Sequence, residues 1–411
     1  MTEPEQKPPP RIAFFPWLRL PSEIAIGRFR LIKYDRDLGT PGLTPEVHAR
    51  VRATLKTHRW FGGTELESAV LVEVDGKIVV NDFSNALSEE VFELREVLAF
   101  CGLASRWLYG QDFNYTNRST FFAMVAPLAT EHGFVAVASR GRSGRRLHGW
   151  DRDHLVTIIP AHANTAPTID KRLLEALWSA RSGEHWTALL DVIHYFNAAN
   201  TDSDDIDESF EMVLTVAAVQ RLLGSMHRLD AAVRELGAAF GFVHDLRVER
   251  ARAADIDGPS RRKVPVRRVT DWWTEVHKLR GGQAHGARRP SSIHRTREDF
   301  EHLLLAAWFV PRLVKVKLHE WGLYRASDDD FGEFEAFPAM LGRPHSSPRT
   351  KDPKSSFERS PCDRIINRCE SRWRHIAIMA SYREKGYVEG VTKKEDGTGY
   401  VVDVPVDYDD L

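Results

Sequence analysis

The sequence predicts an α+β protein: an N-terminal mixed α/β domain, then an all-α helical bundle, then a small C-terminal helix plus β-hairpin. Up to about residue 165, short β-branched or alternating segments are separated by turn residues. From residue 169 onward, apolar residues recur at helical spacing in one segment after another. The chain has 411 residues, 42% of them hydrophobic and 28% charged, which is enough for two or three domains with sizeable cores.

The mixed domain is expected over residues 11–165. Its clearest signal is Asp75–Gly76, which separates two apolar runs and accepts the positive φ angles of a tight hairpin turn. The flanking strands are expected over residues 69–74 and 77–80. Ser88 is expected to cap a helix over residues 89–105. The other expected elements are strands over 12–18, 23–34, 133–139 and 154–159, and helices over 45–57 and 121–128.

The helical bundle is expected over residues 168–325, with five or six helices. They are predicted over residues 169–181, 184–199, 208–224, 229–242, 271–279 and 299–324. A polar, proline-punctuated linker is expected over 326–360. Residues 361–405 are expected to form a helix and a second hairpin around Asp396–Gly397.

The segment from Asp271 to Gly286 contains the strongest candidate site. Its helix is expected to stop at Gly281–Gly282, which leaves Arg280 and His285 beside a helix end. A guanidinium group grips phosphate through a planar fork of donors. An imidazole exchanges a proton near neutral pH. The pair therefore suits phosphodiester chemistry without a metal, and no metal or cofactor is expected.

The R-x4-H spacing alone is a weak signal, because it recurs at Arg289–His294 and at Arg297–His302. The amphipathic helix and the glycine pair favour the first occurrence. The plainer interpretation of that pair is a surface arginine and a loop histidine.

The charge distribution favours a phosphate-bearing partner near this pair. From Arg261 to Arg297 there are eleven Lys/Arg and two Asp/Glu residues, although the net charge of the chain is −1. A solvated arginine-rich loop is the alternative. The arginine–glycine run over residues 140–146 has two similar interpretations, a loop that wraps a nucleic-acid backbone or, more simply, a solvated hairpin loop.

Several function classes find no support in the sequence. There is no P-loop motif and no G-x-G-x-x-G between a strand and a helix. The three cysteines, Cys101, Cys362 and Cys369, are too few for a disulfide framework or a zinc ribbon. The polar, proline-rich start is unlike a signal peptide, and the longest apolar run is too short to span a bilayer. A cytoplasmic protein without membrane contact is expected.

Two separate stretches resemble a HEPN domain of the ApeA-like group found in prokaryotic defence proteins. One stretch, residues 195–203, reads YFNAANTDS and is followed by the helix that ends with AAVQRLLG at residues 217–224. The other stretch, residues 279–286, reads LRGGQAHG. The match covers about residues 170–325, and residues 15–20, FPWLRL, are more loosely similar to the start of such proteins.

The resemblance implies a helical bundle that pairs as a homodimer and acts as a metal-independent endoribonuclease. By the resemblance, Arg280 and His285 are the motif arginine and histidine, which face their copies across the dimer. An RNA 2′-hydroxyl can attack its own phosphate when a base removes its proton and cations stabilise the phosphoryl oxygens, leaving a 2′,3′-cyclic phosphate. One histidine does not readily act as both base and acid, and a two-fold dimer supplies two. The residues expected to bind RNA are Lys278, Arg267, Arg268, Arg288 and Arg289.

The chain departs from the family at two positions. Gly281 stands where the family often has a polar residue, and Gln220 stands where members commonly have Glu. A non-catalytic HEPN module that binds RNA or a nucleotide is therefore the alternative function, and a purely structural dimerisation bundle is a third. In the nuclease hypothesis, the N-terminal domain senses a phage or cellular trigger molecule.

Overall fold

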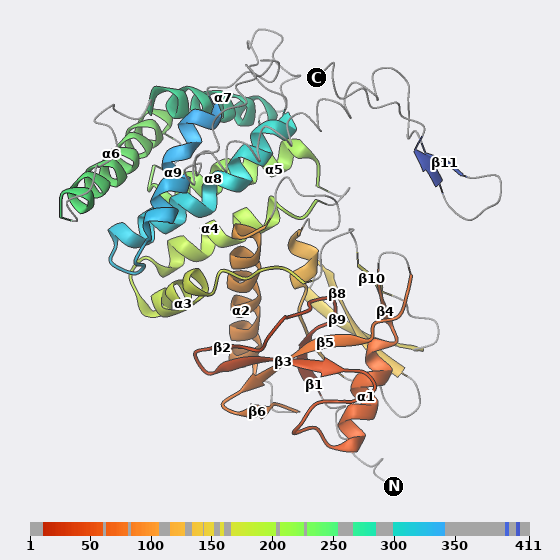
Figure 1. The fold of residues 1–411 in the computed structure, drawn as a ribbon. Helices are drawn as coiled ribbons and strands as arrows, with labels where there is room; N and C mark the ends of the chain where they lie inside the picture. Colours follow the sequence, from red (N-terminus) through yellow and green to blue (C-terminus); the bar gives the residue numbers. More distant parts are fainter. Residues whose placement is uncertain are drawn as a thin grey trace. The chain divides into compact units, whose positions relative to one another are not determined.

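The computed structural model has an α+β fold, with a β-sheet in the N-terminal part and a helical region after it (Figure 1). This confirms the predicted fold class. The structure describes residues 11–60, 63–80, 84–106, 116–127, 134–142, 144–151, 157–159, 166–202, 206–225, 228–253, 266–284, 299–341, 391–393 and 400–402. None of the described helices combines the length and the apolar character that a membrane span requires.

The chain groups into two compact units, each made of separate stretches. The first unit contains Met1–Glu235 and Thr274–Arg325, and the second contains Leu236–Trp273 and Ala326–Leu411. The N-terminal strands and the first helices therefore belong to one unit. The predicted domain boundaries remain predictions, except that part of the linker expected over residues 326–360 is helical.

An antiparallel sheet forms the N-terminal part of the first unit. Among the described residues its strand order is β2-β3-β5-β1-β7, and β6 pairs with β5. The strands are β1 (Arg11–Phe15), β2 (Ile24–Ile26), β3 (Phe29–Asp35), β5 (Ser68–Val74), β6 (Lys77–Ile78) and β7 (Met124–Pro127). The β5–β6 turn is the predicted one, since Asp75 and Gly76 have φ angles of 50° and 77°. The single strand expected over residues 23–34 is a hairpin instead, because Gly27 turns the chain with a φ of 55°.

Helix α1 (Pro45–Leu55) covers one face of this sheet. Its N-cap is Thr44, whose side chain accepts a hydrogen bond from Val47 N. The helix contributes Val51 and Leu55 to a buried cluster with sheet residues such as Leu71. Val70 and Val72 of β5 are buried as well, and consecutive strand residues point to opposite faces, so β5 is covered on both sides.

Helix α2 (Asn85–Ala104) is the central helix of the first unit. Ser84 caps it by accepting from Leu87 N at 3.0 Å, so the cap lies four residues before the predicted Ser88. All residues from 96 to 103 are buried, which shows that packing surrounds the second half of the helix. Figure 1 shows α2 between the sheet and the helices that follow it.

The remaining helices of the first unit pack around α2. They are α3 (Lys171–Ser179), α4 (Trp186–Ala198), α5 (Glu208–Leu222) and α8 (Asp299–Glu320). Helices α3, α4 and α8 contact α2, and α5 packs against α4 and α8. Helix α5 follows its prediction closely, since Asp207 caps its start and Gly224, with a φ of 62°, lies just beyond its end. Lys315 of α8 forms a 2.7 Å ion pair with Asp170, the N-cap of α3.

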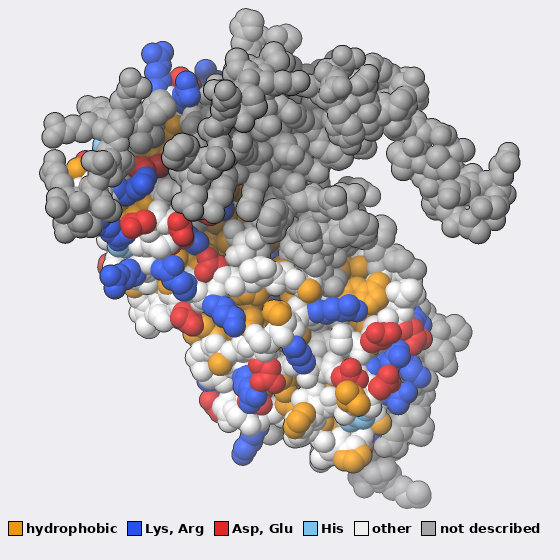
Figure 2. Space-filling view, in the orientation of Figure 1, with side chains coloured by type: hydrophobic (Ala, Val, Ile, Leu, Met, Phe, Trp, Pro, Cys, Tyr) orange, Lys and Arg blue, Asp and Glu red, His pale blue; other side chains and the backbone are white. Residues whose placement is uncertain are grey.

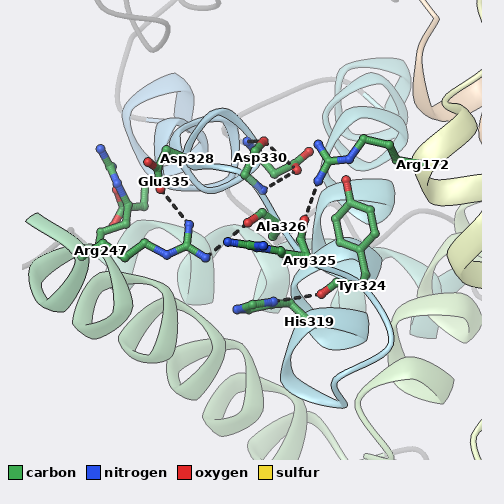
Figure 3. A network of polar contacts seen from close by, with 11 residues as sticks. Arg172, Arg247, His319, Tyr324, Arg325, Ala326, Asp328, Asp330 and Glu335 are labelled. Atoms are coloured by element: carbon green, nitrogen blue, oxygen red, sulfur yellow. Dashed lines mark hydrogen bonds and ion pairs between the residues drawn. The ribbon is translucent and has the colours of Figure 1, made fainter. Parts of the chain in front are cut away.

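The second unit contains residues 236–253 of α6 (Leu229–Ala253), residues 266–273 of α7 (Val266–Ala284) and all of α9 (Asp328–Leu341). The rings of Phe240 and Phe334 stack at 4.2 Å. Arg247 pairs with Glu335, and Arg250 Nη1 lies 2.8 Å from Asp328 Oδ1. These contacts join α6 to α9, and Figure 3 shows the Arg247–Glu335 ion pair.

Short polar contacts close the turn after α8 in the first unit. His319 Nδ1 donates to the carbonyl of Tyr324 at 2.9 Å, and Arg172 of α3 donates to the carbonyl of Arg325 (Figure 3). The guanidinium group of Arg172 also lies over the Tyr324 ring, 5.2 Å from its centroid. The C-terminal end of α8 is thereby joined to the start of α3.

Three predicted elements are wrong. Residues 121–128 are not a helix: a 3₁₀ turn, η2 (Arg118–Phe121), precedes β7. The run over 140–146, expected as a hairpin loop, is mostly strand, because β8 (Phe134–Gly141) and β9 (Gly144–Asp151) pair through it as far as Gly141↔Gly144. Residues 328–341 are helix α9 rather than linker, because Phe331, Phe334 and Phe337 repeat at helical spacing and are fully buried.

The remaining predictions have mixed outcomes. Strand β10 (Thr157–Ile158) lies within the segment 154–159 and pairs in parallel with β4 (His58–Arg59), a strand that was not predicted. Helix α6 continues to Ala253, beyond its expected end at residue 242. The second hairpin is confirmed by the pairing of β11 (Val391–Lys393) with β12 (Tyr400–Val402). The helix expected after residue 361 lies outside the described residues.

Candidate functional site at the end of helix α7

Arg280 lies inside α7, which continues through Gly281 and Gly282 to Ala284. The predicted helix stop at the glycine pair is therefore wrong. A glycine destabilises a helix interior by about 1 kcal/mol relative to alanine, but it keeps its backbone donor and does not have to end the helix. His285 comes directly after the last residue of α7 and lies outside the described residues.

The guanidinium group of Arg280 is partly enclosed. The residue is half-buried, and its Nε atom is buried without a hydrogen-bond partner among the described residues. Its neighbours on the helix, Val276 and Leu279, are buried and anchor this part of α7. An arginine side chain has five N–H donors and no acceptor, so Arg280 has donor capacity for an anionic group.

Gln220 joins α5 to α7 one turn before Arg280. Its Nε2 atom lies 3.2 Å from Nε2 of His277. An amide nitrogen only donates, so Nε2 of His277 is the acceptor in this contact. Gln220 is buried and His277 is half-buried. The contact joins the stretch over residues 217–224 to α7 at a position two residues before the second family-like stretch begins at Leu279.

A second polar pair lies between α7 and α8. His302 is fully buried, and its Nε2 atom lies 3.5 Å from Oε1 of Glu275. Neither ring nitrogen of His302 makes a hydrogen bond among the described residues. His302, the histidine of the third R-x4-H occurrence, is thus located in the interior, and Arg297 lies outside the described residues. The Glu275 side chain is 11% exposed beside His302, a contact that the spacing of the apolar residues in α7 did not predict.

The predicted RNA-binding residues have different positions. Lys278 is exposed on α7, in the first compact unit. Arg267 and Arg268 are exposed in the first turn of α7, in the second unit, and Arg267 Nε lies 3.6 Å from Asp271 Oδ2. Arg288 and Arg289 lie outside the described residues. On the face seen in Figure 2, Lys and Arg side chains are interspersed with Asp and Glu side chains.

The stretch over residues 195–203 has a structural role that the sequence analysis did not predict. Asn197 Nδ2 donates to both the carbonyl and the side chain of Glu96 on α2, at 2.9 and 2.7 Å. Asn200 Oδ1 accepts from Arg106, and Asn200 Nδ2 donates to Phe196 O at 2.6 Å. These asparagines attach the end of α4 to α2. The spacing of residues within the stretch does not predict this attachment, because Glu96 and Arg106 are about a hundred residues away in the chain.

No group of three or more His, Cys, Asp or Glu side chains in the described part of the chain is arranged to hold a metal ion. No protein-family model matches the chain, and no curated protein or solved structure shows significant similarity to it.

Proposed function

We propose that this protein is a cytoplasmic, metal-independent endoribonuclease of a prokaryotic defence or toxin-type system, with an ApeA-like HEPN bundle as its catalytic part. Arg280 and His285 of two chains would line one cleft in a homodimer. A phage or cellular molecule would trigger the activity.

The observation that carries the proposal is the environment of Arg280. Its Nε atom is enclosed and has no hydrogen-bond partner among the described residues, and the candidate histidine follows the same helix end directly. The Gln220–His277 contact supports the proposal, because it joins the helix that holds the first motif to the helix that holds the second.

The proposed reaction follows from these groups. One His285 would take the proton from the RNA 2′-hydroxyl, and the partner's His285 would give a proton to the leaving 5′-oxygen. Arg280 would hold the phosphate and stabilise the charge that develops on its oxygens. The products would be a 2′,3′-cyclic phosphate and a 5′-hydroxyl. An RNA with deoxyribose at the cleaved position would stay intact.

The test uses the purified full chain with single-stranded RNA and tRNA in the presence of EDTA, followed by analysis of the RNA ends. Cleavage to 2′,3′-cyclic phosphate ends is expected for the wild type. His285→Ala and Arg280→Ala should each lower the rate by at least about a hundredfold, since each removes a catalytic contact. His294→Ala is the matched control, a histidine of the same basic segment outside the proposed motif, and should cleave at the wild-type rate.

The second measurement is made in cells. Cells, or phage infection, supply the proposed triggering molecule that the purified protein lacks. Expression of the wild type at matched levels, with and without phage infection, should arrest growth, and His285→Ala should not. Equal toxicity of both proteins, or intact RNA in every condition, would contradict the nuclease proposal.

The second candidate function is a non-catalytic module that binds RNA or a nucleotide. Gln220 favours it, because a neutral amide faces His277 where the family commonly has a carboxylate. This function predicts that the wild type binds RNA without cutting it and that Arg280→Ala weakens the binding.

A further inference from the structure

A pocket of about 290 Å³ lies in the first compact unit, away from α7. Its walls come from the second half of α2, from the 3₁₀ turn η2 with the residue after it, and from Thr201 in the stretch over residues 195–203. The lining residues are Arg95, Glu96, Ala99, Arg118, Ser119, Phe121, Phe122 and Thr201. Neither the proposed nuclease chemistry nor the family resemblance assigns a role to it.

Two guanidinium groups converge on one carboxylate in this pocket. Arg95 Nη2 and Arg118 Nη2 both donate to Glu96 Oε1, the latter at 2.8 Å. Glu96 Oε2 accepts from Asn197 at 2.7 Å. The Glu96 side chain is only 3% exposed, and burial disfavours its charged form. Arg118, Arg95 and Asn197 together outweigh burial and hold the pKa of Glu96 below its usual value.

The pocket therefore has a surplus of positive charge. Two arginines face one carboxylate, and each guanidinium group uses one nitrogen on it. Among the described residues the side chains of Arg95 and Arg118 make no other hydrogen bond, although Arg95 also lies over the Phe92 ring, 5.2 Å from its centroid. The side chains of Arg95 and Arg118 are 25% and 34% exposed, so a ligand can reach their free donors. Such donors fit the oxygens of a phosphate group.

Part of the pocket lining is aromatic. Phe121 is buried, whereas Phe122 is 39% exposed and is held by Trp17, with ring centroids 5.2 Å apart. An exposed ring that is fixed by a buried one offers a flat surface on which a nucleobase can stack. The lining also includes the hydroxyl-bearing residues Ser119 and Thr201.

From this arrangement we infer that the pocket binds a nucleoside monophosphate, with its phosphate on Arg95 and Arg118 and its base against Phe122. The volume of about 290 Å³ is near the lower end of ligand pockets, which span roughly 300–1,000 Å³, and selects a small ligand. None of the residues that line this pocket belongs to the proposed cleavage motif, so nucleotide binding here does not depend on the nuclease activity.

Calorimetry on the full chain tests the inference, with AMP, GMP, UMP, CMP, adenosine and inorganic phosphate as probes. At least one nucleoside monophosphate should bind in the micromolar range, at least tenfold more tightly than inorganic phosphate, and adenosine should not bind. Phe122→Ala should weaken binding of the nucleotide and leave binding of phosphate unchanged. Equal affinity for phosphate and nucleotide, or no binding of any nucleotide at millimolar concentration, would overturn the inference.

Three further variants separate a binding defect from a folding defect. Glu96→Gln removes the competing anion and keeps the side-chain shape, so nucleotide binding should tighten severalfold. Arg118→Ala in the Glu96→Gln background leaves no unpaired buried carboxylate and should weaken binding at least tenfold relative to Glu96→Gln alone. Arg181→Ala removes a control arginine outside the pocket; its side chain is 27% exposed and pairs with Glu93 of α2. Its affinity should equal that of the wild type, and a loss there would contradict the assignment.

Discussion

Gln220 of α5 and His277 of α7 lie 3.2 Å apart, joined through the side-chain amide of one and the ring Nε2 of the other. The two residues are 57 positions apart in the chain. His277 is three residues, about one helical turn, before Arg280. The identity of residue 220 therefore controls the electrostatic environment of α7 close to the proposed catalytic arginine.

Replacing Gln220 with Glu should raise the pKa of His277, because a carboxylate next to an imidazole favours its charged form. NMR titration of the His277 ring measures this shift directly. Gln220→Met is the control, since it has a similar length but neither charge nor donor, and should leave the pKa of His277 lower than in the Glu variant. Identical titration curves for the Glu and Met variants would show that residue 220 does not contact His277 in solution.

Gly281→Ala should stabilise the protein by up to about 1 kcal/mol, because the residue lies within α7 and a Cβ atom there would meet no atom of another described segment within 4 Å. Gly102→Ala should instead destabilise it by about 1–3 kcal/mol, because the new Cβ would overlap the ring of Phe121. Urea unfolding gives the free energy of unfolding of each variant, which is compared with that of the wild type. A loss of stability in Gly281→Ala would indicate that the helix stops before the glycine.

The sequence predicted elements well where a local signal decides the structure. The Asp75–Gly76 turn and the ends of α5 depend on residues that accept a particular backbone conformation or cap a helix, and these were found. The end of α7 was missed because burial of Val276 and Leu279 outweighs the modest destabilisation by two glycines. Helix α9 was missed although its phenylalanines repeat at helical spacing, because the polar residues and prolines around them dominated the interpretation.

The candidate site was predictable only in part. The position of Arg280 beside a histidine was visible in the sequence, since both belong to one short segment. The contact of His277 with Gln220 and the burial of Glu275 against His302 depend on how three helices pack. No periodicity within one helix specifies which residue of another helix faces it.

Glu211 should make the protein less stable as the pH rises from about 5 to 8. Burial, and next the nearby Asp202, raise its pKa from its usual 4.5 to about 8. Between these two values the unfolded chain releases a proton that the folded chain keeps, so the free energy of unfolding falls with pH, by at most about 1.4 kcal/mol per pH unit. The residue lines a pocket of about 210 Å³ with Arg106 and Glu208.

Thermal melts of Glu211→Gln at pH 5, 6, 7 and 8 test this linkage. The variant should lose less stability over the range than the wild type, because an amide does not titrate. Glu175→Gln is the control, an exposed carboxylate of α3 that is not among the charges acting on Glu211, and should follow the wild-type profile. Parallel profiles for the wild type and Glu211→Gln would mean that Glu211 titrates normally in the folded protein.

Asn197 should be a structural residue despite its place in the family-like stretch. It is fully buried, and its amide donates two hydrogen bonds to Glu96, one of them to the buried carboxylate. Asn197→Ala should lower the free energy of unfolding by about 2–4 kcal/mol, because both bonds are lost and one of them is to a charged group. Asn197→Asp should lower the free energy of unfolding further than Asn197→Ala at pH 8, where two buried carboxylates face each other. At pH 4.5 part of this lost stability should return. Burial and the nearby Glu96 would raise the pKa of the new Asp above its value in the unfolded chain. The free energy of unfolding of this variant therefore falls as the pH rises. Urea unfolding at both pH values measures the difference, and an Asp variant as stable as the wild type at pH 8 would show that Asn197 does not hold Glu96.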